Sequence, residues 1–191
     1  MAKVLSDGKL ILTNVRLAFP HLNEVSQKTN KYGAAFIFNK DSDNAKVLEE
    51  TVLRVAKDKF GARAEKVVAA MKRTDKFPVK DGDNKADYAG YANNLYCNAN
   101  SNVQPTLVMP DRRPMSEKEV AEYLYAGAVV NVVIGVFAYD SSKGGADGVG
   151  IGLQGVQFVT HGERFGGGAK AKDDDFPELE LAEEDNIDAF G

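Results

Sequence analysis

One short stretch of the chain combines side chains that could contact nucleobases. Between positions 95 and 100, apolar residues alternate with Tyr96, Asn98 and Asn100. A period of two is typical of a β-strand, whose successive side chains point to opposite faces. The sequence therefore predicts a strand with one apolar face and one face of phenol and amide groups. Such a face can stack on bases and exchange hydrogen bonds with them.

Two other motifs resemble ligand-binding loops but lack essential parts. The run from Gly150 to Gly155 matches the glycine spacing of a dinucleotide-binding turn, yet it lies inside an expected strand and opens no helix. Asp81, Asp83 and Asp87 resemble the first half of a calcium loop. Alanine occupies the positions where that loop needs glycine and glutamate. We expect an acidic solvated loop there and no cofactor.

Catalytic and metal sites are also not indicated. The two histidines, His21 and His161, lie far apart, and their spacing with the single cysteine, Cys97, does not suggest a zinc site. No nucleophile with a neighbouring base and no paired carboxylates stand out. The sequence predicts a protein that is not an enzyme.

Strand patterns dominate both ends of the expected domain. Leu10 to Phe19 alternates, with Ile11, Val15, Leu17 and Phe19 on one side, and Lys31 to Phe38 forms a second strand with Phe36 and Phe38 assigned to the core. Val129 to Asp140 and Val149 to Thr160 form a hairpin around a turn rich in Ser, Gly and Asp. The sheet should be mainly antiparallel and could close into a small barrel.

Helices are expected between these strands. Apolar residues at three- and four-residue steps predict a helix from Asp41 or Asp43 to Phe60, ended by Gly61. A shorter helix is expected over 62–71. Ser116 and Glu119 form a capping box that opens a third helix through Tyr125.

Charge is distributed unevenly along the chain. The net charge is −4, but nine of the 28 acidic residues lie in the last nineteen positions, which contain no basic residue. The preceding 172 residues therefore carry +5. A block of like charges stays solvated, and a basic domain attached to it suggests binding of another polyanion, nucleic acid being the commonest. A tail that only maintains solubility is the alternative, but the tail also carries Phe176 and Phe190, which are typical of anchors for a partner.

These patterns divide the chain into three parts. We expect a mainly β domain with α+β elements over 1–165, a flexible Gly/Lys linker over 166–172 and a disordered acidic tail over 173–191. The sequence has no long apolar run and no signal-peptide pattern, which predicts a cytoplasmic protein with no membrane contact.

Several short motifs, taken in order, resemble a family of tailed-phage proteins long described only as a conserved phage domain of unknown function. The matching segments are Lys31-Tyr32, Asp81-Gly82-Asp83, Tyr88-Ala89-Gly90-Tyr91, Asn98-Ala99-Asn100-Ser101, Tyr125-Ala126-Gly127, Phe137-Ala138-Tyr139 and Gly150 to Gly155 with Gln157. The family comprises OB-fold single-stranded DNA-binding proteins. The resemblance covers Leu10 to the acidic end, and segments 92–96 and 103–115 depart from the pattern.

This resemblance implies a five-stranded Greek-key OB-fold barrel with helical insertions. It also implies sequence-independent coating and protection of single-stranded DNA in phage replication or recombination, in the cytoplasm of an infected bacterial host. Such binding needs aromatic platforms and a cationic groove. The candidates for DNA contact are Arg16, Lys31, Tyr32, Tyr91, Tyr96, Asn98, Asn100, Arg112, Arg113, Phe137, Tyr139 and Lys143.

The acidic tail is expected to compete with DNA for the groove and to recruit replication or recombination proteins. Its candidate partner-binding residues are Asp173, Asp174, Asp175, Phe176, Glu183, Glu184, Asp185 and Phe190. The protein is expected to be a monomer or a small homo-oligomer. The alternative function is a protein-binding adaptor or a DNA-mimic inhibitor that acts through the tail.

Overall fold

The computed structural model describes residues 1–166, without the side chain of Lys143. Of the expected linker only Gly166 falls within this range. The expected acidic tail, with all of its candidate partner-binding residues, lies outside the described residues.

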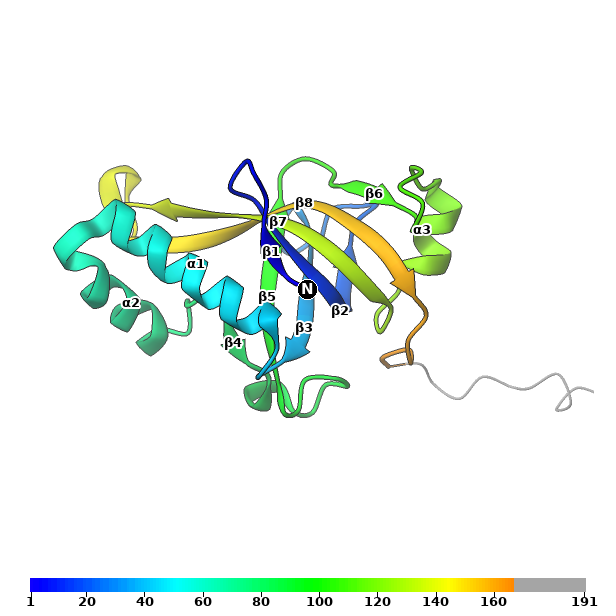
Figure 1. Cartoon of the computed structure of the whole chain (residues 1–191), viewed down its shortest axis with the longest axis horizontal. Coiled ribbons are helices and arrows are strands. Elements are labelled where there is room, and N and C mark those ends of the chain that lie inside the picture. The colour runs from blue at the N-terminus through cyan, green and yellow to red at the C-terminus, as the bar shows by residue number, and fades with distance from the viewer. Residues whose placement is uncertain (167–191) are drawn as a thin grey trace, which may run out of the picture.

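Five strands form a closed barrel, shown in Figure 1: β2 (Leu10–His21), β3 (Tyr32–Asn39), β5 (Asn94–Ser101), β7 (Val129–Tyr139) and β8 (Gly148–Thr160). Antiparallel pairs run in the order β5-β3-β2-β7-β8. A parallel pairing of Asn100 in β5 with Gly152 in β8 closes the ring. The OB-fold barrel predicted above is therefore confirmed.

Helices fill two of the connections. The connection from β3 to β5 contains α1 (Asp43–Phe60), a short 3₁₀ turn η1 (Gly61–Arg63) and α2 (Ala64–Arg73). In Figure 1 these helices lie beside the long hairpin of β7 and β8, which we call the β7–β8 arm. Ser42 caps α1 by accepting a hydrogen bond from the Ala45 amide, so the expectation that Asp41 or Asp43 is the cap was wrong. Gly61 ends α1 with a φ of 53°, as predicted from its position.

The third helix is shorter than its pattern predicted. α3 (Glu117–Tyr123) opens with the predicted capping box between Ser116 and Glu119, but it ends two residues before Tyr125. The remaining elements are too short to leave a periodic signal in the sequence. They are β1 (Lys3–Val4), β4 (Lys80–Asp81), η2 (Gly82–Lys85), β6 (Thr106–Val108) and η3 (Ser141–Lys143).

Two irregularities in β2 decide which of its side chains face the core. The register with β7 shifts between Leu12 and Val15, so Leu12 is buried before the shift and Val15 after it. A second shift, against β3, follows Ala18. Because each β-bulge adds one residue to a period of two, it reverses the face of every later side chain. The prediction that Phe19 shares the face of Val15 was therefore wrong, and Phe19 is 52% exposed.

Strand β3 is buried on both faces. Phe36 and Phe38 lie in the main core inside the barrel, as predicted. On the outer face, Ala35 and Ile37 belong to a second, smaller cluster with Ala18, Tyr91 and Tyr96. The segment that leads into β5 therefore covers part of the outside of the barrel.

Candidate nucleic-acid interface

A continuous groove crosses the outer face of β3 and β5. It consists of two hollows of about 390 and 270 Å³ that share Lys31, Asn98 and Asn100. We call this surface the β3–β5 groove. One end lies against the β7–β8 arm at Phe137 and Tyr139, and the other reaches Phe19 and His21 at the end of β2.

At the end beside the β7–β8 arm, two exposed rings pack over glycines of the neighbouring strand, which we call the glycine floor. Phe137 is 52% exposed and Tyr139 40% exposed. Phe137 pairs across the arm with Gly150, and Tyr139 with Gly148. A Cβ at Gly150 would lie 2.8 Å from the Phe137 ring, and one at Gly148 would lie 2.4 Å from the Tyr139 hydroxyl. The glycines thus let both rings pack against bare backbone, which leaves the other faces of the rings available for stacking.

Ion pairs hold this end of the groove against the helices. Lys59 of α1 contacts Asp140 at 2.9 Å, and Arg63 of η1 contacts Asp147 at 2.9 Å. Hydrogen bonds from Ser142 and then Lys59 hold the pKa of Asp140 well below its usual range. Both carboxylates flank the hairpin turn, so the arm that carries the rings is anchored at its tip.

The middle of the groove has the polar residues predicted from the alternation in β5. Asn98 and Asn100 are exposed, whereas Cys97 and Ala99 are fully buried on the opposite face. Lys31 is exposed between them and the loop that follows β2. Tyr32 is half-buried and lines neither hollow, so the structure does not bring it into the groove.

The prediction that Tyr91 and Tyr96 are exposed platforms was wrong. Tyr96 lies on the same face of β5 as Asn98, but it is only 3% exposed because Tyr91 packs over it with ring centroids 5.0 Å apart. Tyr91 itself is 1% exposed. Burial raises the pKa of Tyr91 to about 12, and its hydroxyl has no hydrogen-bond partner among the described residues. Neither ring can accept a base in this arrangement.

The loop that covers Tyr96 contributes exposed aromatic surface of its own. Tyr88 is 53% exposed and meets Phe19 edge-on at 5.5 Å between ring centroids. Sequence reasoning missed both residues, since Phe19 was expected on the core-facing side and Tyr88 was quoted only as part of a family motif and given no role. The two neighbouring tyrosines of Tyr88-Ala89-Gly90-Tyr91 were the signal available for this second aromatic site.

Lysines from the same connection supply most of the positive charge in the groove. Lys76 and Lys80 line the hollow beside Phe137, and Lys85 lines the hollow beside Phe19. Lys85 also lies over the Tyr96 ring, 5.0 Å from its centroid. Asp75 is the counter-charge in the first hollow and contacts Lys80 at 3.0 Å. With Lys31, four lysines line the groove, and only Lys31 was among the predicted contacts.

Arg16, a predicted phosphate contact, binds the chain's own backbone instead. Its Nε donates to the Gly127 carbonyl and its guanidinium also donates to the Glu163 carbonyl, each at 2.9 Å. The guanidinium lies 4.6 Å from the centroid of the Phe165 ring. Arg16 therefore fixes the segment that follows β8.

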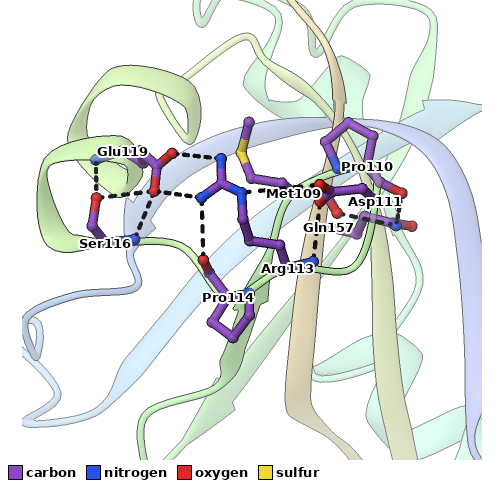
Figure 2. A network of polar contacts seen from close by, with 8 residues as sticks. All are labelled: Met109, Pro110, Asp111, Arg113, Pro114, Ser116, Glu119 and Gln157. Atoms are coloured by element: carbon purple, nitrogen blue, oxygen red, sulfur yellow. Dashed lines mark hydrogen bonds and ion pairs between the residues drawn. The ribbon is translucent and has the colours of Figure 1, made fainter.

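Arg113 is similarly engaged, as Figure 2 shows. It forms two hydrogen bonds with Glu119, at 2.7 and 3.1 Å, while Glu119 accepts from the Ser116 amide at 2.9 Å. Hydrogen bonds from Arg113 and Ser116 lower the pKa of Glu119 to about 2. Arg113 thus stabilises the start of α3 and lies outside the groove.

Of the other two predicted cations, Arg112 lies away from the β3–β5 groove, and the side chain of Lys143 is not among those described. Arg112 is exposed and lines a separate hollow of about 370 Å³ beside Asn131 and Gln157. Lys143 belongs to η3 at the tip of the arm, and its side chain lies outside the described part of the structure.

The described residues offer no set of metal ligands. Within residues 1–166, no three His, Cys, Asp or Glu side chains gather where they could hold a metal ion. Burial raises the pKa of the Cys97 thiol to about 12, so the thiol stays protonated at neutral pH. In the described range, no helix has both the length and the apolar character needed to span a membrane.

The closed five-stranded barrel, with its groove across the second and third barrel strands, is an OB-fold of the type that binds oligomeric ligands. Residues 8–187 match the family model described as Enterobacter phage Enc34, ssDNA-binding protein, and the chain belongs to this family. Putative protein p50 of Acyrthosiphon pisum secondary endosymbiont phage 1 is 33% identical over 186 residues, covering 94% of this chain and 98% of that protein.

Solved structures of phage proteins share the fold. The single-stranded DNA-binding protein from bacteriophage Enc34 in complex with ssDNA superposes with a TM-score of 0.72 at 24% identity, covering 86% of this chain and 93% of that one. The single-stranded DNA-binding protein gp2.5 of bacteriophage T7 gives a TM-score of 0.54 at 10% identity, covering 87% and 92%. These two similarities concern the architecture of the barrel.

Proposed function

We propose that this protein binds single-stranded DNA without sequence preference and coats and protects it during phage replication or recombination. The β3–β5 groove carries the proposal, because it combines exposed rings at both ends with four lysines along its walls. Family membership supports the same ligand. The protein would act in the cytoplasm of the infected bacterial host, as a monomer or a small homo-oligomer, by binding and not by catalysis.

Each part of the groove has a role that the chemistry of a single strand requires. Bases stack on Phe137 and Tyr139, and each stacked base contributes roughly 1–3 kcal/mol. Lys31 and the lysines of the 76–85 segment neutralise phosphates. Asn98 and Asn100 carry both a donor and an acceptor, so they can pair with the edge of any base. Stacking and charge dominate, which explains why no sequence preference is needed.

The salt dependence of binding tests the cationic groove. If four lysines each neutralise one phosphate, the logarithm of affinity should fall with the logarithm of salt concentration with a slope of about −3. Fluorescence anisotropy with a labelled oligo-dT measures this slope. Lys31→Glu should weaken binding and make the slope shallower, whereas Lys118→Glu, on α3 and away from the groove, should leave both unchanged. A protein that retains no oligonucleotide would instead favour the adaptor or DNA-mimic alternative.

The acidic C-terminal segment is proposed to regulate this binding. Nine acidic residues over 173–191 carry the charge of a competing polyanion, and the apolar residues among them would dock on a polymerase, helicase or nuclease once DNA displaces the segment. A chain that ends at Gly168 should therefore bind oligo-dT more tightly than the full chain at low salt. Equal or weaker binding by the shortened chain would refute the competition.

A further inference from the structure

The described chain ends beside an aromatic pocket. A cavity of about 300 Å³ is lined by Phe19, Tyr88, Tyr91, Phe165, Asp87 and Gly166, the last described residue. Its volume is at the lower end of the range for ligand sites, which suits one bulky side chain. We call it the exit pocket. Because Phe19 and Tyr91 also line the neighbouring hollow, the exit pocket adjoins the end of the β3–β5 groove.

The exit of the chain at this pocket is held firmly. Arg16 binds the Glu163 carbonyl, and the Phe165 amide donates to the Ala126 carbonyl at 2.9 Å. A Cβ at Gly90 would lie 2.3 Å from the Phe165 ring, so this ring packs directly on the backbone of the loop that carries Tyr88. The C-terminal segment therefore starts from a fixed point beside the exit pocket.

We propose that the exit pocket binds Phe176 of the chain's own C-terminal segment. Phe176 is ten residues beyond Gly166, a distance that a flexible chain covers with a root-mean-square span of about 16–19 Å. The tethered ring is present at an effective concentration in the millimolar range, which favours this occupant over a free one. Phe19, Tyr88 and Phe165 offer it edge and face contacts.

The charges that follow Phe176 are complementary to those of the adjoining groove. Lys170 and Lys172, followed by Asp173, Asp174 and Asp175, precede Phe176. Asp87 lies at the exit pocket with no ion-pair partner among residues 1–166, so these two lysines are the residues of the segment that can pair with it. After Phe176 come six acidic residues over 178–188. Beyond the pocket, the adjoining groove carries Lys85 and Lys31. A chain anchored by Phe176 therefore directs its acidic residues onto the lysines of the groove.

This inference rests on the proposed competition between the segment and DNA, and it identifies where the segment is anchored. Occupation of the exit pocket makes the competition depend on one apolar side chain as well as on total charge. Phe190 lies fourteen residues further along and remains available to a partner protein.

Photo-crosslinking in the full-length chain tests the anchor directly. With p-benzoylphenylalanine in place of Phe176, irradiation without DNA should link position 176 to peptides that contain Phe19 or Tyr88, as mass spectrometry would show. The same photoprobe in place of Phe190 is the matched control and should not give these links. Crosslinks from position 176 that spread over the surface, or that match those from 190, would overturn the proposal.

DNA affinity separates this proposal from the proposed competition. Phe176→Ala should raise the affinity of the full chain for oligo-dT at low salt by roughly tenfold, the ratio expected when the pocket buries about half of the ring. Phe190→Ala should leave it unchanged. If position 176 crosslinks to the pocket but truncation at Gly168 does not change affinity, the anchor stands and the competition fails. If Gly168 truncation raises affinity and Phe176→Ala does not, the competition stands and the anchor fails.

Discussion

Two pairs of aromatic residues lie along the same groove, and only one pair is exposed. Phe137 and Tyr139 project from the β7–β8 arm over glycine, whereas Tyr91 and Tyr96 pack edge to face and are at most 3% exposed. Tyr96 in β5 and Phe137 and Tyr139 in β7 all occupy outward-facing positions in the alternation of their strands. The difference arises because the arm extends beyond the covering loop, while Tyr96 lies directly under it. Alternation therefore gives the face of a side chain but not what covers that face.

The largest effect that distinguishes the two pairs should come from removing a buried ring. Tyr96→Ala leaves a cavity under Tyr91 and should lower the free energy of unfolding by about 3 kcal/mol. Tyr139→Ala is the control, since that ring is 40% exposed, and it should cost less than about 1 kcal/mol. Urea denaturation measures both. Equal losses would mean that the two pairs do not differ in structural role.

Removing an exposed ring should have the converse effect on binding. Phe137→Ala should weaken binding to oligo-dT by roughly 5- to 150-fold, which corresponds to the loss of one stacked base. The unfolding transition should stay nearly unchanged. Val103→Ala serves as the control because Val103 is 74% exposed and lines neither hollow of the groove. Affinity that survives Phe137→Ala in an anisotropy titration would remove the arm from the interface.

The unpartnered hydroxyl of Tyr91 gives a smaller and opposite change in stability. Tyr91→Phe removes a buried polar atom without a hydrogen bond and should raise the free energy of unfolding by about 1 kcal/mol. Tyr88→Phe, at an exposed ring, should change it little. A loss of stability in Tyr91→Phe would show that this hydroxyl has a partner in solution.

The same residue predicts a pH dependence. The pKa of Tyr91 is raised from 10.0 to about 12 in the folded protein, so folding favours the neutral phenol. This preference adds to the free energy of unfolding in full below pH 10, and the added stability is lost as pH rises from 10 to 12. Denaturation measured across this range should show a decline in the native protein that is reduced in Tyr91→Phe.

The smallest effect should come from the glycine floor. Gly150→Ala places a methyl group 2.8 Å from the Phe137 ring and forces it to tilt, which should weaken oligo-dT binding by roughly threefold. Gly152→Ala is the matched control, because its nearest contact with that ring would be an ordinary 3.7 Å. Identical affinities for the two variants would indicate that the ring has no fixed position on the floor.

The sequence predicted most strands and helices of the barrel because they carry clear periodic signals, while the OB-fold arrangement of the strands was implied by the family resemblance. The alternation in β5 correctly placed Asn98 and Asn100 on one face, and the capping box located the start of α3. It could not place Phe19, because a β-bulge is an extra residue in the pairing register and leaves no mark in hydrophobic alternation.

The cationic residues of the site were predicted less well, for a related physical reason. Arg16 and Arg113 are basic residues near expected strands, but each has found acceptors in a distant carbonyl or a nearby carboxylate. Lys76, Lys80 and Lys85 lie in a connection with no periodic pattern, and only the folding of this connection beside β5 brings them to the groove. Sequence shows which charges exist, whereas the charge of the groove depends on where each of them lies in the fold and on which partners it finds there.

The pairing of Asn100 with Gly152 places the seam of the barrel at the floor of the groove. A ligand lying across Asn100 would span the pairing of β5 with β8 that closes the barrel, and would hold these two strands together. Occupied protein should therefore melt at a higher temperature, with the slowest amide exchange gained around 100 and 152.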